Sequence, residues 1–299
     1  MKLAFKIDVD TCQGTKKGAR NLADLFASEG IPATFLFSLG KDQTGRSITR
    51  VFQKGFIAKC LKSNVSGNYG KRTLMYGTLL PSPVIYKSCA DIIAGVHAQG
   101  FECGVHSWNH YKWQNKVRKM TPAAARAEFK MAFDALNEII GGKCVSCGSA
   151  GWQVVPAYFA AQDEFGLLYA SDVRGSYPFI PRFEGKVYNT LQIPSTLYTL
   201  DEVLCDISLA DAAGAYLADM KKADAQGRVS VMTIHAELEG MAYAEWFADF
   251  LKLLKRSGVE FVGLRDYAER LLQDRESIPI CDVEMTEFYN RSGLLATQH

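Results

Sequence analysis

Short apolar runs with the pattern of strands alternate along this chain with segments of helical periodicity. The runs at 3–9 and 33–38 are apolar almost throughout, and residues 21–29 between them have helical spacing and end at Gly30. Buried parallel strands are continuously apolar, and the crossover that joins them is usually a helix. The alternation therefore predicts an α/β fold made of βα units around a parallel sheet.

The same two patterns continue through most of the chain. Further strands are predicted at 101–105, 144–149, 169–171, 192–194, 229–234 and 259–262, and further helices at 88–99, 128–140 and 244–256. About seven strands fit a βα-barrel, since such barrels take roughly 250 residues. We expect one barrel domain over residues 1–275, and an extended or mobile tail over 276–299, where no period persists.

Polar residues with catalytic chemistry follow these strands directly. Asp8 and Asp10 lie at the end of the first strand, His106 follows the 101–105 strand, and His235 follows the 229–234 strand. Because the carboxyl ends of all strands in a barrel share one face, these residues are expected to converge there. The sequence therefore predicts an active site on that face.

The pentapeptide from His106 to His110 (His-Ser-Trp-Asn-His) has the spacing of a metal-binding pair. Residues four apart lie on one side of a helical turn, where both imidazoles can reach one ion. Asp8 and Asp10 are two apart and point the same way, so Asp10 can complete the metal shell while Asp8 acts as a general base. One divalent ion is expected, Zn²⁺ first, with Mn²⁺, Co²⁺ or Ni²⁺ as alternatives.

Chance spacing of histidines, with Asp8 and Asp10 as solvated loop carboxylates, is the alternative. We favour the functional interpretation because three of the five histidines fall within one pattern of strand ends. A metal ion makes water acidic enough to serve as a nucleophile near neutral pH. His235 is then the candidate acid that protonates the leaving group.

These motifs, in this order, resemble those of the polysaccharide deacetylase (NodB-homology) family of metal-dependent amide hydrolases. The resemblance implies a distorted (β/α)₇ barrel, with Asp8 as base and His235 as acid. It implies that the metal ligands are Asp10, His106 and His110.

Longer runs resemble one branch of that family. Residues 6–11, 149–152, 171–175, 192–194 and 233–240 are similar to bacterial deformylases of undecaprenyl-phosphate-linked 4-deoxy-4-formamido-L-arabinose. This similarity implies release of formate from a lipid-linked sugar, in the modification of lipid A with aminoarabinose that confers polymyxin resistance. Two alternatives are an N-deacetylase of another amino sugar or polysaccharide, and a sugar-lipid binding protein with an inactive site.

The chain departs from the family in one motif. Most members carry an Arg-x-Pro-Tyr-like segment whose arginine orients the base, but the matching segment here, 149–152, is Ser-Ala-Gly-Trp. Arg174, next to Asp172, is the expected substitute, and a backbone N–H near Trp152 is expected to hold the oxyanion. Four residues are thus expected to bind substrate or support the catalytic groups: Trp152, Asp172, Arg174 and Glu237.

An insert at about 42–88, after the second strand, is basic and amphipathic. No acidic residue occurs between Asp42 and Asp91. A basic amphipathic segment is typical of membrane-surface binding, and each cation near an anionic leaflet adds about 1 kcal/mol. The alternative is an ordinary solvated helix on the barrel. The residues expected to contact the membrane or a lipid phosphate are Arg46, Arg50, Lys54, Lys59 and Lys62.

Composition narrows the setting. A net charge of +2 provides no general attraction for nucleic acid, and eight scattered cysteines are typical of reduced thiols in a cytosolic protein. No signal peptide or membrane span is predicted. We expect a cytoplasmic protein, peripheral on the inner membrane, whose partners are a lipid-linked sugar and the anionic membrane surface, with no nucleic acid and no obligate protein partner.

Overall fold

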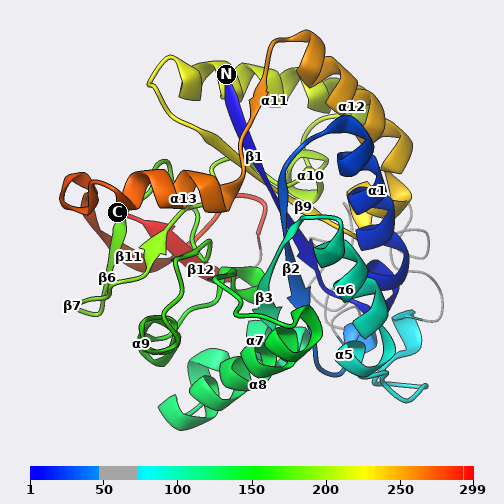
Figure 1. The fold of residues 1–299 in the computed structure, drawn as a ribbon, viewed down its shortest axis with the longest axis vertical. Coiled ribbons are helices and arrows are strands. Elements are labelled where there is room, and N and C mark those ends of the chain that lie inside the picture. Colours follow the sequence, from blue (N-terminus) through cyan, green and yellow to red (C-terminus); the bar gives the residue numbers. More distant parts are fainter. Residues whose placement is uncertain (47–72, 292) are drawn as a thin grey trace.

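A curled parallel sheet surrounded by helices forms the centre of the computed structural model, which describes residues 1–46, 73–291 and 293–299 (Figure 1). The strand order is β10-β1-β2-β3-β4-β5-β8, and β9 also pairs with β1. Strand β1 (Lys2–Val9) is central, with β2 (Ala33–Ser38), β9 (Ser230–His235) and β10 (Glu260–Phe261) as parallel partners. The predicted α/β class with a parallel sheet is confirmed.

The remaining strands continue the curl away from β2. They are β3 (Glu102–Ser107), β4 (Ser146–Cys147), β5 (Tyr169–Ala170) and β8 (Leu191–Gln192). Beyond β8, the backbone N–H groups of Thr196 and Leu197 donate to the carbonyl of Val231 in β9, at 3.0 and 3.2 Å. The two ends of the sheet therefore meet through hydrogen bonds at one residue of β9 rather than through a regular ladder.

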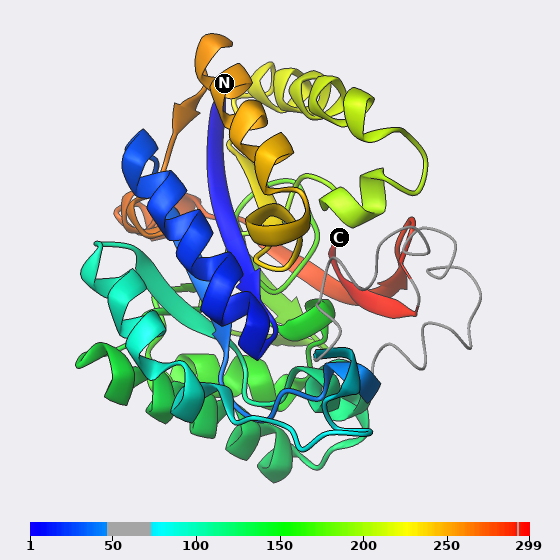
Figure 2. The same ribbon diagram turned by 90° about the vertical axis from the view of Figure 1, so that its right-hand side faces the viewer.

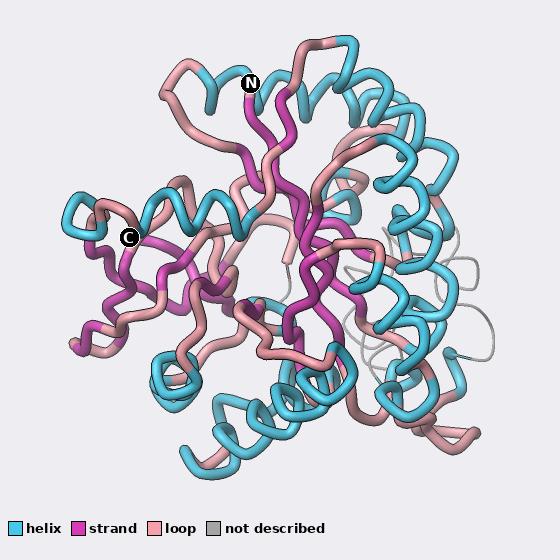
Figure 3. Tube along the Cα trace, viewed as in Figure 1, coloured by secondary structure: helices cyan, strands magenta, loops and turns pink. Residues whose placement is uncertain are grey.

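Helices cover the outside of this sheet (Figures 1 and 3). Phe5 of β1 packs against Phe26 and Phe247, with ring centroids 5.2 and 5.7 Å away. Burial of such aromatic faces is the main force that holds helices on a sheet. The longer helices are α1 (Arg20–Glu29), α6 (Ala90–Ala98), α7 (His110–Lys116), α8 (Pro122–Ile140), α9 (Pro156–Phe165), α11 (Leu209–Asp224), α12 (Ala244–Arg256) and α13 (Leu264–Leu272).

Alternation along β1 separates the outside of the curled sheet from its inside. While Phe5 packs on the helices, Ala4 belongs to a second apolar cluster with residues of β5, β8 and β9. Lys6 and Asp8 continue that inner face, because side chains two apart in a strand point the same way. The interior is thus apolar near the start of β1 and polar toward its end, where the candidate site lies.

A second, four-stranded sheet has the order β12-β11-β6-β7 and lies beside α13 and α9 (Figure 1). Its strands are β6 (Ile180–Phe183), β7 (Lys186–Val187), β11 (Ile280–Glu287) and β12 (Leu294–Gln298). Where we expected an extended or mobile tail, β11 and β12 pair as antiparallel strands, and β11 also pairs in parallel with β6. Burial of Cys281 and Val283 against the rest of the protein holds this hairpin in place.

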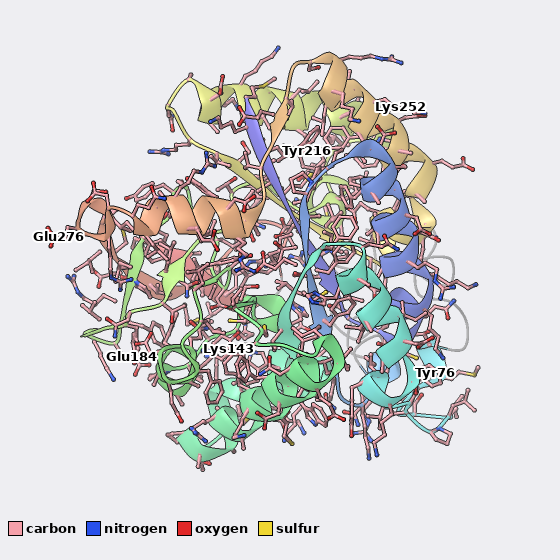
Figure 4. All side chains as sticks on the ribbon, viewed as in Figure 1. Tyr76, Lys143, Glu184, Tyr216, Lys252 and Glu276 are labelled. Atoms are coloured by element: carbon pink, nitrogen blue, oxygen red, sulfur yellow. The ribbon has the colours of Figure 1, made fainter. Side chains whose placement is uncertain are left out.

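Side chains follow the same division between surface and interior. Lys252, Glu184 and Glu276 project at the periphery, whereas Tyr216 is buried against Phe250 (Figure 4). Turning the molecule by 90° shows β1 running between the helices of both sides (Figure 2). None of the described helices is long and apolar enough to cross a bilayer.

The structure describes only part of the basic insert. Arg46 is exposed, and its Nε donates to the carbonyl of Gly77 at 2.7 Å. The other predicted membrane contacts, Arg50, Lys54, Lys59 and Lys62, lie outside the described residues.

Candidate active site

The two catalytic candidates Asp8 and His235 face each other across neighbouring strands. The parallel register of β1 and β9 pairs Asp8 directly with His235, and the N–H of Ala236 donates to the Asp8 carbonyl at 3.0 Å. Their side chains therefore leave the sheet side by side. Asp8 is buried, whereas His235 is partly open to solvent.

Asp10, directly after β1, lies against both histidines of the pentapeptide. Its Oδ1 is 3.2 Å from His106 Nε2 and 3.4 Å from His110 Nε2. The prediction that these histidines share a helical turn is wrong, because His106 is in β3 and His110 begins α7. Asn109 caps α7 by accepting the Lys112 N–H at 2.8 Å, and this cap turns His110 back toward His106.

The three side chains fit a divalent metal ion. One ligand atom from each lies within 4.8 Å of the others, and Asp10 Oδ1 is buried with no hydrogen-bond partner among the described residues. Ligands at 2.0–2.1 Å from a tetrahedral ion are about 3.3 Å apart, close to the distances found here. His106 Nδ1 lies 2.6 Å from the Gly148 carbonyl, and donation to this oxygen leaves Nε2 free for a metal.

Electrostatics also suit metal binding. Burial opposes the charged form of Asp10, but attraction to His110 and His106 outweighs it and lowers the pKa of Asp10. Burial lowers the pKa of His110. Burial also opposes a charge on His106, but attraction to Asp8 and Asp10 raises the pKa of His106. A charged Asp10 and a neutral His110 match the states that metal ligands require, whereas His106 would have to give up its proton when a metal ion binds.

Glu237 supports the chain segment that carries Asp10. Its Oε1 accepts hydrogen bonds from the backbone N–H of Asp10 at 3.2 Å, and from the N–H and hydroxyl of Thr11 at 2.9 and 2.8 Å. Burial, together with repulsion from Asp10, raises the pKa of Glu237 to about 8. The predicted supporting role of Glu237 thus has a specific target, the backbone at Asp10 and Thr11.

Glu239 has the corresponding position behind His235, and the sequence analysis missed it. Its Oε2 accepts the backbone N–H of His235 at 2.8 Å, and burial raises the pKa of Glu239 to about 7. The available signal was a second glutamate four residues after His235.

Contrary to expectation, Arg174 does not pair with Asp8, the candidate base. Its guanidinium pairs with Glu202 at 3.2 Å and lies 4.5 Å from the Phe288 ring centroid. The cation next to Asp8 is Lys6, whose Nζ is 3.6 Å from Asp8 Oδ1. Arg174 follows the end of β5 in an irregular segment, where it pairs with Glu202 instead.

Trp152 and Asp172 have structural contacts. The N–H of Trp152 donates to the Ser149 carbonyl at 3.1 Å, so the expected oxyanion donor is already occupied. Asp172 is fully buried and accepts from the Ser149 N–H and from Gln162 Nε2, both at 2.7 Å. These bonds hold the loop after β4 against the end of β5.

A small pocket open to solvent lies beside the metal-binding cluster. Asp10 and His110 form one wall, and aromatic and charged side chains form the others. Aromatic faces and a few polar groups are typical of sites that bind sugars or other small molecules. The further lining residues are Ser38, Lys41, Asp42, Gln43, Thr44, Ile85, Trp108 and Tyr111.

Fold and cluster together define an α/β protein with a site for one divalent metal ion beside a second carboxylate and a histidine. Comparison with known proteins narrows this class. Residues 7–147 match the family model described as polysaccharide deacetylase. The chain belongs to the polysaccharide deacetylase family.

Two relatives cover nearly all of the chain, and both are named "Probable 4-deoxy-4-formamido-L-arabinose-phosphoundecaprenol deformylase ArnD". The protein from Shewanella sediminis (strain HAW-EB3) is 35% identical over 99% of this chain and 94% of its own length. The protein from Wigglesworthia glossinidia brevipalpis is 31% identical over 95% of this chain and 98% of its own length.

Solved structures agree with the fold. A "putative polysaccharide deacetylase" from Mycobacterium smegmatis superposes with a TM-score of 0.65, at 16% identity, over 93% of this chain and 92% of that chain. Puue allantoinase superposes with a TM-score of 0.62, at 16% identity, over 91% of this chain and 90% of that chain. At this identity the likeness concerns the fold alone.

Proposed function

We propose that this protein is a metal-dependent deformylase. Its substrate would be undecaprenyl-phosphate-linked 4-deoxy-4-formamido-L-arabinose, and its products formate and the free 4-amino sugar lipid. The observation that carries the proposal is 35% identity over 99% of the chain to a protein named for this reaction. The cluster of Asp10, His106 and His110 supports it, because hydrolysis of an amide at neutral pH needs an activated water.

Each site residue has a role in this proposal. Asp10, His106 and His110 would hold one divalent ion, with Zn²⁺ as the first expectation and Mn²⁺, Co²⁺ or Ni²⁺ as alternatives. When bound, the ion would supply Lewis acidity toward water and the formamide oxygen. Asp8 accepts the proton of the attacking water, and His235 on the neighbouring strand donates a proton to the departing amine.

The proposal extends to the architecture and the setting. The curled sheet would be the distorted (β/α)₇ barrel of this family, over residues 1–275, with the basic insert at about 42–88 near the cavity. The substrate in the relatives' name is a phosphoprenol, so the enzyme would work at a membrane surface. We propose the cytoplasmic face of the inner membrane, with the insert as the contact to anionic lipid and to the lipid phosphate.

The test is formate release from the formylated sugar lipid in vesicles containing anionic lipid. Wild type is expected to release formate with metal present, and Asp8→Asn and His106→Ala are expected to lose at least 100-fold in kcat. Asp249→Asn is the control, because Asp249 is exposed and its ion-pair partner is Lys252. Activity that survives Asp8→Asn would contradict the mechanism.

Two further readouts separate the alternatives. Acetate release from an acetylated amino sugar, without formate release from the formylated lipid, would indicate an N-deacetylase instead. Binding of the sugar lipid without turnover in metal-loaded protein would indicate a binding protein.

A further inference from the structure

We infer that Lys6 is the positioning residue for the Asp8 carboxylate, in the place where other family members use an arginine. The inference rests on the proposed function insofar as Asp8 is the general base. It concerns a residue whose side chain is wholly inside the protein.

The Lys6 side chain is fixed from three directions. It is fully buried, and its Nζ donates to the Ser171 carbonyl at 2.9 Å. The same Nζ is 3.6 Å from Asp8 Oδ1 and 5.4 Å from the centroid of the Trp152 ring. These contacts come from β1, from the end of β5 and from the loop after β4, so the ammonium has little freedom to move.

Local sequence produces this arrangement. Lys6 and Asp8 are two apart in β1, so both side chains point into the curled sheet. Gly148 on the opposite side leaves room, because a Cβ there would lie 3.3 Å from Lys6 Nζ and 2.5 Å from Leu36 Cδ1. The carbonyl of Gly148 also faces His106 Nδ1, so one glycine accommodates the lysine and orients a metal ligand.

Charge explains why a lysine is found here at all. A buried ammonium is unfavourable unless an anion accompanies it. Asp8 lies within ion-pair distance of Lys6, and the buried Asp172 also attracts it. Asp8 Oδ1 is itself buried and accepts no hydrogen bond from the described residues. Attraction across 3.6 Å is much stronger inside a protein than in water, so each group fixes the other.

The consequence for catalysis is orientation. Lys6 attracts Oδ1 of Asp8, which leaves Oδ2 as the oxygen that takes the proton of water. Arg174 cannot share this role, because it pairs with Glu202 and packs on the Phe288 ring. The chain thus keeps the function of the missing motif arginine but supplies the cation from β1.

The test compares Lys6→Met, Lys6→Arg, Asp8→Asn and the double variant Lys6→Met/Asp8→Asn. We expect Lys6→Met to lower kcat about 100-fold with KM and metal content within twofold of wild type. Lys6→Arg keeps the positive charge, so its kcat should be at least tenfold higher than that of Lys6→Met. In the Asp8→Asn background, Lys6→Met should lower kcat less than twofold, because the Asp8 carboxylate that Lys6 orients is no longer present.

Lys252→Met is the matched control. It makes the same lysine-to-methionine change, but in an exposed ion pair with Asp249. A kcat for Lys6→Met within twofold of wild type would overturn the inference, and so would a loss that adds fully to that of Asp8→Asn. If wild type hydrolyses an acetylated sugar instead of the formylated lipid, the proposed function fails, while the same comparison on that substrate still tests Lys6.

Crystal structures give a readout that needs no turnover. The Asp8 carboxylate should rotate away from its wild-type orientation in Lys6→Met and keep it in Lys6→Arg. An unchanged Asp8 in both variants would refute the positioning role. If Lys6→Met does not fold, Lys6→Gln, which keeps a donor without the charge, takes its place in both measurements.

Discussion

Replacing Glu237 with alanine tests whether hydrogen bonds from the backbone at Asp10 and Thr11 to Glu237 stabilise the candidate metal site. Three donors converge on Glu237 Oε1, namely the N–H groups of Asp10 and Thr11 and the Thr11 hydroxyl. The hydroxyl can reorient, but the two backbone N–H groups lose their acceptor in Glu237→Ala. Each unsatisfied buried donor costs about 1–3 kcal/mol, so we expect a loss of about 2–6 kcal/mol in the free energy of unfolding.

Part of that loss should appear as weaker metal binding. Asp10 is held by its backbone next to Glu237, and removal of a group that orients a ligand lowers metal affinity by about 10–100-fold. Affinity is measured by competition with a chromophoric chelator, and stability by urea unfolding of the metal-free protein. Glu237→Ala should change both quantities in the same variant.

Two variants control this experiment. Glu237→Gln keeps a carbonyl oxygen at Oε1, and because the pKa of Glu237 is raised to about 8, the wild-type group is largely a neutral acid at pH 7. Glu237→Gln should therefore bind metal within about threefold of wild type. Glu239→Ala removes the acceptor of His235 N–H and should leave metal affinity unchanged. Metal binding by Glu237→Ala at wild-type affinity, or equal defects in the alanine and glutamine variants, would refute the reasoning.

Three other predictions concern the metal, pH and packing. Dialysis against a chelator should abolish amide hydrolysis, and Zn²⁺ or Co²⁺ should restore it, as measured by product release. Burial raises the pKa of Glu102 above its usual 4.5 despite hydrogen bonds from Ser146, Thr34 and Tyr169. Its protonated form thus stabilises the fold below pH 4.5, and this contribution is lost as pH rises through the raised pKa. Wild type should therefore lose stability relative to Glu102→Gln as the pH rises above 4.5, which urea unfolding measures. Gly104→Ala would place Cβ 2.5 Å from Leu36 Cδ2 and should destabilise by about 1–3 kcal/mol, whereas Gly95→Ala in α6, with no atom within 4 Å, should stabilise by up to about 1 kcal/mol in the same assay.

Strongly patterned elements were predictable to the residue. The predicted strand 33–38 and helix 244–256 have the bounds of β2 and α12. Both have unambiguous signals, a continuous apolar run in β2 and one apolar stripe in α12 that buries Phe247, Leu251 and Leu254. Helix α11 was missed because it is rich in alanine and has little contrast between its faces.

The C-terminal hairpin of β11 and β12 was not predicted, for a different reason. Cys281 and Val283 alternate with exposed Asp282 and Glu284, so a strand signal was present in β11. What one sequence does not reveal is its partner, since Ile280 pairs with Ile180, a strand from a distant part of the chain. Without that partner, a short alternating stretch near a terminus looks the same as an unpaired tail.

In the site, contacts between residues at the ends of neighbouring strands were predictable from the strand order. Contacts that depend on where an individual side chain points were not. The parallel sheet brings Asp8 and His235 together because both end neighbouring strands. The prediction of Arg174 as the cation beside Asp8 was wrong, because Arg174 pairs with Glu202 and Lys6 lies next to Asp8. The useful signal was Lys6 itself, a charged residue with apolar neighbours on both sides and two positions before Asp8 in β1.

Charge balance explains why a divalent metal ion would bind at Asp10 and not at a neighbouring carboxylate. The acidic groups buried or partly buried around the site include Asp8, Asp10, Asp42, Glu237 and Glu239. Lys6 accompanies Asp8, and burial raises the pKa of Glu237 to about 8 and that of Glu239 to about 7, which favours their neutral forms. Asp10 has a lowered pKa and is therefore an anion whose nearest polar neighbours are imidazoles. Two neutral imidazoles and one carboxylate carry a net negative charge. Either a protonated histidine or a bound cation can compensate it. A divalent cation does so while His110 stays neutral and Asp10 stays charged.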